Sequence, residues 1–283
     1  MSPNSKFRHA CANGYLEIAK QLVDTYPSVI NVSAQDNYAF WCACSNGHLE
    51  VAKWLVDICP SVVNIYANYN HAFQSTCYRG HLKVAKWLVD SCSSVVNIHA
   101  EYDCAFICAC DGGYLEIAQW LVKSCPQINI SACDNQAFRY ACSKGRLEVA
   151  KWLVESYPSA VNISACDDYA FRFACAHGYL KVAKWLVQIH QSVNVFADYN
   201  QAFRNACIYQ KIEVAKWLIE IRPHYYIIEL DESQTRILGW KFRPIQEIKW
   251  LERAVPILAY NSKTPNIFQR LNYDTMRYIC EFV

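Results

Sequence analysis

Several features that mark common classes of protein are missing from this sequence. It has no apolar run of the roughly 18 residues that a membrane-spanning helix needs, and its opening residues MSPNSKFRHA do not resemble a secretory leader. Its 27 Lys and Arg stand against 25 Asp and Glu, so bulk charge attracts neither nucleic acid nor a membrane surface. We therefore expect a reduced, cytoplasmic protein without either of these partners.

Motifs of catalysis and ligand binding are also missing. No glycine-rich phosphate loop and no C-x-x-C pair occur in the 283 residues. The one dense cluster of Cys, Trp and His, residues 39 to 65, recurs along the chain, whereas a catalytic site normally occurs once. We therefore expect a building block rather than an enzyme, with no cofactor.

The repeat is what fills the chain. A phenylalanine returns every 32 or 33 residues, a cysteine follows it four residues later, and six of the seven copies add a tryptophan. The marker residues are Phe7, Phe40, Phe73, Phe106, Phe138, Phe171 and Phe203. This period predicts seven repeats within residues 1–222, followed by a distinct segment, 223–283.

Each copy has the pattern of two short helices and a turn. In the second copy, residues 39–45 form a small-residue and aromatic segment that Gly47 stops, and residues 48–58 carry apolar side chains at helical spacing. Pro60 ends this second helix, and the next tip, residues 68–70, contains Asn, which tolerates left-handed turns.

These helix pairs resemble ankyrin repeats. The runs GHLEVAKWLV from Gly47, GHLKVAKWLV from Gly80 and GRLEVAKWLV from Gly145 follow the ankyrin consensus closely. The resemblance implies an all-α ankyrin-repeat solenoid of helix-turn-helix repeats, a non-enzymatic scaffold that binds another protein, and a structural role for His48 and His81. The first helix departs from the consensus, and this variant of the repeat sequence is similar to that of ankyrin proteins encoded by giant DNA viruses of amoebae. That likeness implies a viral protein acting on host proteins.

The 16 cysteines are expected to be core residues. Equivalent cysteines of neighbouring repeats would lie about 8 to 10 Å apart if the helices stack normally. A disulfide needs Cα atoms within about 7 Å, which excludes a disulfide ladder. Cys42 and Cys44, at i and i+2, point to different faces of a helix, so no metal site is expected.

Recognition is expected where side chains vary while the core stays constant. In an ankyrin-like stack, the first helices and the turn tips line the concave face, and the residues flanking the constant Ala-Phe vary between copies. The partner-binding candidates are Tyr38, Trp41, His71, Gln74, Arg139, Tyr169, Arg172, Gln201 and Arg204. An equally weighted alternative is that the arginines pair with the acidic tips Asp134, Asp167 and Asp198 as a structural ladder.

The last 60 residues differ from the repeats. Residues 227–230 favour a short extended piece, and helices are expected from Pro244 to Pro256 and over residues 270–283. The segment is expected to be a cap, a degenerate eighth repeat or a separate helical module. Its end also resembles a truncated F-box, as in poxvirus ankyrin proteins, which implies recruitment of a host ubiquitin ligase adaptor. The residues concerned are Leu271, Met276, Ile279 and Phe282.

The preferred function is therefore a monomeric scaffold that binds an unidentified protein of the host cytoplasm. Two alternatives stay open: a substrate adaptor that delivers its target to the ubiquitin ligase, and a structural component of the virion.

Overall fold

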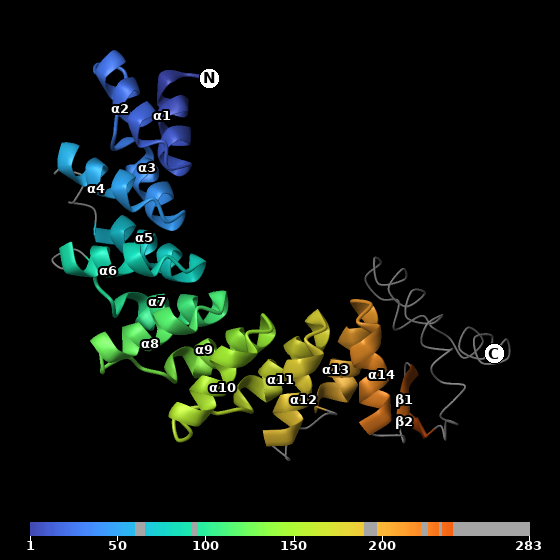
Figure 1. Ribbon diagram of the computed structural model, residues 1–283. Coiled ribbons are helices and arrows are strands. Elements are labelled where there is room, and N and C mark those ends of the chain that lie inside the picture. The colour runs from blue at the N-terminus through green and yellow to red at the C-terminus, as the bar shows by residue number, and fades with distance from the viewer. Residues whose placement is uncertain (60–65, 92–95, 190–196, 222–225, 232–233, 240–283) are drawn as a thin grey trace. The chain divides into compact units, whose positions relative to one another are not determined.

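The computed structural model describes residues 1–59, 66–91, 96–189, 197–221, 226–231 and 234–239. These residues form seven helix pairs, each with a first and a second helix, followed by two strands (Figure 1). The first helices are α1 Pro3–Ala12, α3 Ala34–Ser45, α5 Tyr66–Arg79, α7 Ala100–Gly112, α9 Ala132–Ser143, α11 Ala165–His177 and α13 Ala197–Ile208. The second helices are α2 Leu16–Thr25, α4 Leu49–Ile58, α6 Leu82–Ser91, α8 Leu115–Ser124, α10 Leu147–Ser156, α12 Leu180–Ile189 and α14 Ile212–Ile221.

The chain divides into two compact units, residues 1–141 with 148–162, and residues 142–147 with 163–283. In the first unit, α1, α3, α5 and α7 pack successively on one another, and in the second unit α11 packs on α13. Each of these first helices also packs against its own second helix. Within each unit the elements therefore stack repeat on repeat, which confirms the expected solenoid class.

Small and aromatic residues of both helices form the core. In the third repeat, Ala72 and Cys77 are fully buried and Phe73 is 1% exposed, while Ala85 and Leu88 of the second helix are also fully buried. The cysteine column is part of this core, as expected, because the Cys11, Cys44, Cys77, Cys110, Cys142 and Cys175 side chains are all 0% exposed. Their burial disfavours the charged thiolate and raises the pKa of Cys11 to about 12.

Aromatic pairs join successive repeats. In five repeats the phenylalanine of the first helix meets the tryptophan of the next repeat's second helix, with ring centroids 6.4 to 6.5 Å apart and the rings edge-on or tilted. The pairs are Phe7–Trp54, Phe40–Trp87, Phe73–Trp120, Phe106–Trp152 and Phe171–Trp217. The phenylalanines and tryptophans that recur in the sequence thus form one type of contact, which is repeated between neighbouring repeats.

A left-handed glycine forms the turn inside the first six pairs, and Gln210, with φ of 56°, takes this position in the seventh. Gly47 has φ of +81°, and a Cβ added there would lie 2.5 Å from Nδ1 of His81 in the next repeat. His48 lies in the same way against Gly14, and its Nε2 is 3.1 Å from the carbonyl oxygen of Ala12. These two histidines therefore brace one repeat on the preceding one, which agrees with the structural role expected for them.

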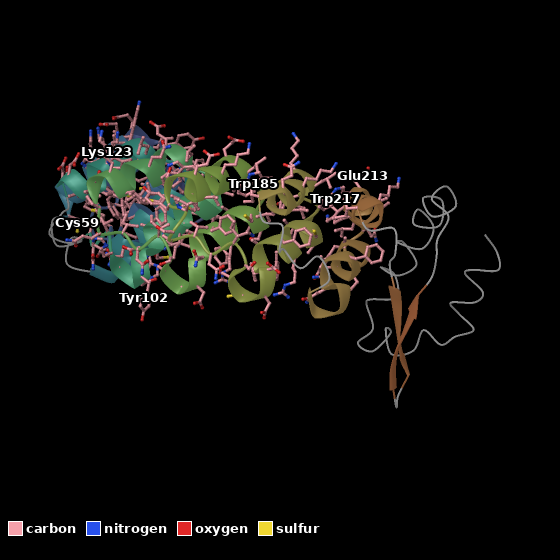
Figure 2. The ribbon with its side chains drawn as sticks, turned by 90° about the horizontal axis from the view of Figure 1, so that it is seen from below. Cys59, Tyr102, Lys123, Trp185, Glu213 and Trp217 are labelled. Atoms are coloured by element: carbon pink, nitrogen blue, oxygen red, sulfur yellow. The ribbon has the colours of Figure 1, made fainter. Side chains whose placement is uncertain are left out.

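The turn tips are left-handed over three residues in a row. Glu101, Tyr102 and Asp103 have φ of 53°, 59° and 61°, and the tips at 133–135 and 166–168 do the same. Tyr102 is 77% exposed and points into solvent (Figure 2). Left-handed geometry costs L-residues roughly 1–2 kcal/mol each, so something must hold these tips in place.

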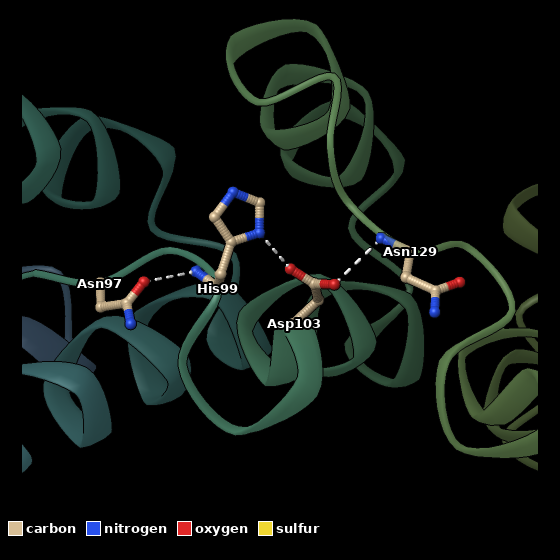
Figure 3. A network of polar contacts seen from close by, with 4 residues as sticks. All are labelled: Asn97, His99, Asp103 and Asn129. Atoms are coloured by element: carbon tan, nitrogen blue, oxygen red, sulfur yellow. Dashed lines mark hydrogen bonds and ion pairs between the residues drawn. The ribbon is translucent and has the colours of Figure 1, made fainter.

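The third tip residue supplies the restraint, because it is buried against the next repeat. Asp103 is 6% exposed, and its Oδ2 accepts a hydrogen bond of 2.9 Å from the backbone N–H of Asn129 in the next repeat (Figure 3). Its Oδ1 lies 2.6 Å from Nδ1 of His99. Oδ1 of Asn135 accepts in the same way from the backbone N–H of Asn162 at 2.9 Å. We call this series the tip ladder.

Residues 226–231 and 234–239 add a pair of β-strands to the helical repeats. Strand β1, Tyr226–Asp231, pairs antiparallel with β2, Gln234–Gly239, so that Ile228 lies opposite Ile237. The expected extended piece at 227–230 is therefore one strand of this pair, whose second strand the sequence reasoning missed. The helices expected after Pro244, with the residues named for adaptor binding, lie outside the described residues.

Candidate functional site: the first-helix face

Burial of the constant Ala-Phe fixes which side chains reach the surface. Ala72 and Phe73 lie in the core. The residues before and after them, His71 and Gln74, are three apart in sequence and therefore share another side of the helix. We call this surface the first-helix face and consider it separately in each unit. In the first unit it comprises Tyr38, Trp41, His71, Ser75, Cys104, Cys108, Gln136 and Arg139, with Cys42, Gln74 and Ile107 buried beneath it. In the second unit it comprises Tyr169, Arg172, Phe173 and Gln201.

Two aromatic side chains of the second repeat stand together on this face. Tyr38 is 44% exposed, and its ring centroid lies 5.6 Å from that of Trp41. The Nε1–H of Trp41 donates a hydrogen bond of 3.1 Å to Oγ of Ser75 in the next repeat. A hydrogen bond to the Cys42 thiol raises the pKa of Tyr38. Trp41 is thus fixed by a neighbour while Tyr38 remains available to a partner.

His71 and Gln74 of the third repeat differ in exposure. His71 is exposed, as a binding residue should be, but Gln74 is 7% exposed. Nε2 of Gln74 is buried and has no hydrogen-bond partner among the described residues. Unpaired buried amides are uncommon, so Gln74 is a polar donor held just beneath this face.

Arg139 of the fifth repeat donates hydrogen bonds to the turn tip of its own repeat. Nε of Arg139 donates to the carbonyl oxygen of Asp134 at 2.8 Å, and one terminal nitrogen donates to that of Cys133 at 2.9 Å. Both acceptors belong to the left-handed tip. Through these two bonds Arg139 holds the backbone of its own tip.

The sixth repeat shows the same arrangement in the second unit. Arg172 donates to the carbonyl oxygen of Cys166 at 3.0 Å, and it also donates to Oε1 of Gln201 in the seventh repeat. Arg172 therefore joins its own tip to the neighbouring first helix. The side chain of Arg204 lies outside the described residues.

An aromatic stack extends along this unit. The ring of Tyr169 lies 4.0 Å from that of Phe173 at an interplanar angle of 17°. His177 follows at 6.0 Å from Phe173, and Tyr179 lies 6.1 Å from His177. The structure thus places Tyr169 in a ring stack, which the sequence pattern did not indicate.

Sequence reasoning missed two other features of the first unit. Cys104 and Cys108 are partly exposed on α7, and their Sγ atoms are 3.8 Å apart. Their i, i+4 spacing could have revealed the pair. The tip ladder could also have been found, because an Asn or Asp ends every tip and an Asn follows about 27 residues later, as for Asn135 and Asn162.

The described residues contain no cluster of three or more His, Cys, Asp or Glu side chains placed to hold a metal ion. In the same part of the chain, no helix has the length and apolar character required to cross a membrane. The arrangement of the first-helix face, with aromatic, amide and guanidinium groups over an apolar core, is suited to contact with another protein.

Comparisons with known proteins agree with this geometry. A family model described as ankyrin repeats in three copies matches residues 7–100 and 76–167, which together are more than half of the chain. The crystal structure of the human ASB11 ankyrin repeat domain is similar, with a TM-score of 0.50 and 17% identity over 69% of this chain and 95% of that one. No curated protein matches the sequence.

Proposed function

The chain belongs to the ankyrin-repeat family, and on that premise we propose that it is a non-enzymatic scaffold whose first-helix face binds a protein partner. One observation carries the proposal: Tyr38 stands 44% exposed beside Trp41, directly over a core that is closed in every described repeat. A large amphipathic side chain that the core does not need is typical of an interface anchor.

The chemistry of the face supports a protein partner more than a small ligand. Within the first unit its groups lie on first helices that pack successively on one another. Tyr38 and His71 come from different repeats of this unit and are both exposed. A series of separate anchors suits an extended polypeptide surface.

The finer proposal concerns the setting. The likeness of this variant of the repeat sequence to ankyrin proteins of giant viruses supports a host protein as the partner and the host cytoplasm as the place of action.

The Arg139 and Arg172 side chains are assigned two roles here, because each donates a hydrogen bond to the turn tip of its own repeat and also lies on the first-helix face.

The test compares partner capture by the full chain and by two tyrosine variants. We expect Tyr38→Ala to reduce the affinity for the captured partner about fivefold or more, because truncating an anchoring interface tyrosine costs more than about 1 kcal/mol. Tyr15→Ala is the matched control, since Tyr15 is 51% exposed at the start of α2, away from this face. Equal affinity of both variants, with unchanged melting temperatures, would remove the first-helix face from the proposal.

The same capture distinguishes the adaptor alternative. Changing Met276 and Ile279 together to Glu in the full chain should leave capture of the partner intact if the scaffold alone is the functional part. If ubiquitin ligase subunits are recovered with the unchanged chain and lost with this variant, the terminal segment is a recruitment element.

A further inference from the structure

Two thiols meet on the surface of α7. Cys104 and Cys108 lie one helical turn apart with their sulfur atoms 3.8 Å from each other, and both are partly exposed. The cysteines of the repeat column differ, because Cys110 and Cys142 have no exposed surface. The repeat architecture therefore explains Cys110 but leaves the Cys104–Cys108 pair without a packing role.

The pair is chemically asymmetric because of its position. Residues 101–103 are left-handed, so the right-handed part of α7 begins at Cys104. The free N–H groups of a helix start favour a negative charge there. A hydrogen bond from the Cys108 thiol lowers the pKa of Cys104, and the same bond raises the pKa of Cys108. Cys104 is the better nucleophile and Cys108 is the thiol beside it.

We propose that Cys104 and Cys108 form a dithiol that hydroperoxides oxidise reversibly to a disulfide. The Cys104 thiolate attacks one peroxide oxygen, the O–O bond breaks, and the leaving oxygen takes protons and departs as water, or as the alcohol of an organic hydroperoxide. Cys104 is then a sulfenic acid. The Cys108 sulfur attacks the Cys104 sulfur, the S–S bond forms and the hydroxyl leaves as a second water. Two electrons pass from the two thiols to the peroxide.

Helix geometry makes this disulfide strained and easily reduced. In an ideal helix, residues four apart have Cα atoms about 6 Å apart, which a disulfide tolerates. Their Cβ atoms are about 5–6 Å apart, whereas a disulfide prefers about 4 Å. The first turn of α7 must therefore tighten. Strained and exposed disulfides have more oxidising potentials, so a cellular dithiol reductant can restore the pair.

The tightened turn adjoins a contact between repeats. Asp103 immediately precedes Cys104, and its Oδ2 accepts the hydrogen bond from the Asn129 backbone N–H. Oxidation should therefore disturb the tip ladder between the fourth and fifth repeats. This inference does not rest on the proposed function, because it requires only the two thiols and a hydroperoxide.

The experiment oxidises the full-length chain with hydrogen peroxide, blocks remaining thiols with an alkylating agent and maps the product by mass spectrometry. Chymotrypsin cuts after Phe106, between the two cysteines, so a Cys104–Cys108 disulfide holds the two resulting peptides together. We expect this linked pair at peroxide concentrations that leave Cys142 unoxidised, and we expect dithiothreitol to separate it. Absence of the linked pair while Cys104 remains a free thiol would overturn the proposal.

Two variants and a matched control test the roles of the two thiols. Cys104→Ser should abolish the linkage, and Cys108→Ser should leave a Cys104 sulfenic acid that dimedone traps. Cys42→Ser is the control, because Cys42 occupies the place of Cys108 in the second repeat, where Tyr38 replaces the other cysteine. The Cys42→Ser variant should form the Cys104–Cys108 linkage as the unchanged chain does. Circular dichroism confirms that each variant is folded, and a Cys108→Ser chain in which dimedone does not label Cys104 would contradict the assignment.

Discussion

At the scale of single residues, the position of a side chain within its repeat determines its burial and its chemical behaviour. A cysteine such as Cys142 is fully buried and its pKa is raised, so it behaves as a small apolar group. Cys104, at the start of a helix beside a second thiol, has a lowered pKa. The tip residues show the same contrast, because Asp134 is exposed whereas its neighbour Asn135 is 7% exposed and bonded to the next repeat.

The tip ladder should be measurable as stability. Asn135→Gly keeps the freedom to adopt the left-handed φ of 62° but removes the acceptor for the Asn162 N–H. Loss of this part-buried hydrogen bond should lower the free energy of unfolding in urea by about 0.5–1.5 kcal/mol. Asp134→Gly, at the exposed neighbouring position, should be neutral or slightly stabilising, and equal losses in both variants would contradict the ladder.

His81 should make stability depend on pH. Burial lowers its pKa in the folded chain, so below the ordinary histidine value of about 6.5 the unfolded chain binds the proton more readily. Its contribution is complete above that value and is lost as the pH falls toward the lower folded pKa. His81→Asn should therefore flatten the decline in melting temperature between about pH 7 and pH 5, whereas His71→Asn, at an exposed position, should preserve it.

At the scale of elements, each helix has a different task. The first helix of a repeat turns its constant Ala-Phe inward and presents variable side chains outward, while the second helix supplies the tryptophan that packs on the previous repeat's phenylalanine. Phe73 of α5 and Trp120 of α8 form such a pair at 6.5 Å. Stability therefore resides in contacts between neighbours as well as within a repeat.

A double-mutant cycle tests this assignment. Phe73→Leu and Trp120→Leu together should show a coupling energy of about 0.5–1.5 kcal/mol, since aromatic pairs contribute about that much beyond the area they bury. Phe73→Leu with Trp152→Leu is the matched cycle, because Trp152 contacts Phe106 instead. Its coupling should be close to zero, and similar couplings in both cycles would mean that the pairing is not specific.

At the scale of the whole molecule, stability is distributed. The two compact units each consist of stacked repeats, and in such a stack a repeat depends directly on its neighbours only. Unfolding of the full chain is therefore expected to deviate from a two-state transition, because in a repeat array the cooperativity is limited to neighbouring repeats.

Hydrogen exchange of the full chain checks this expectation. Phe171→Leu in the second unit should reduce the amide protection of α11 and α14, where Phe171 meets Trp217. Protection of α3 in the first unit should remain unchanged. A uniform loss of protection in both units would show that the chain unfolds as a single cooperative body.

The sequence by itself determined the repeated architecture, because helix pairs of fixed length show in one chain as a period and each repeat carries the same core residues. The left-handed tip geometry at Asn135 and the structural role of His48 were also predictable, since both depend on local backbone and on neighbouring copies. Only the tertiary structure decided where polar side chains go. Arg139 bonds to the tip carbonyls and Gln74 is buried, because these outcomes depend on distances between helices and turns that residue types alone do not specify.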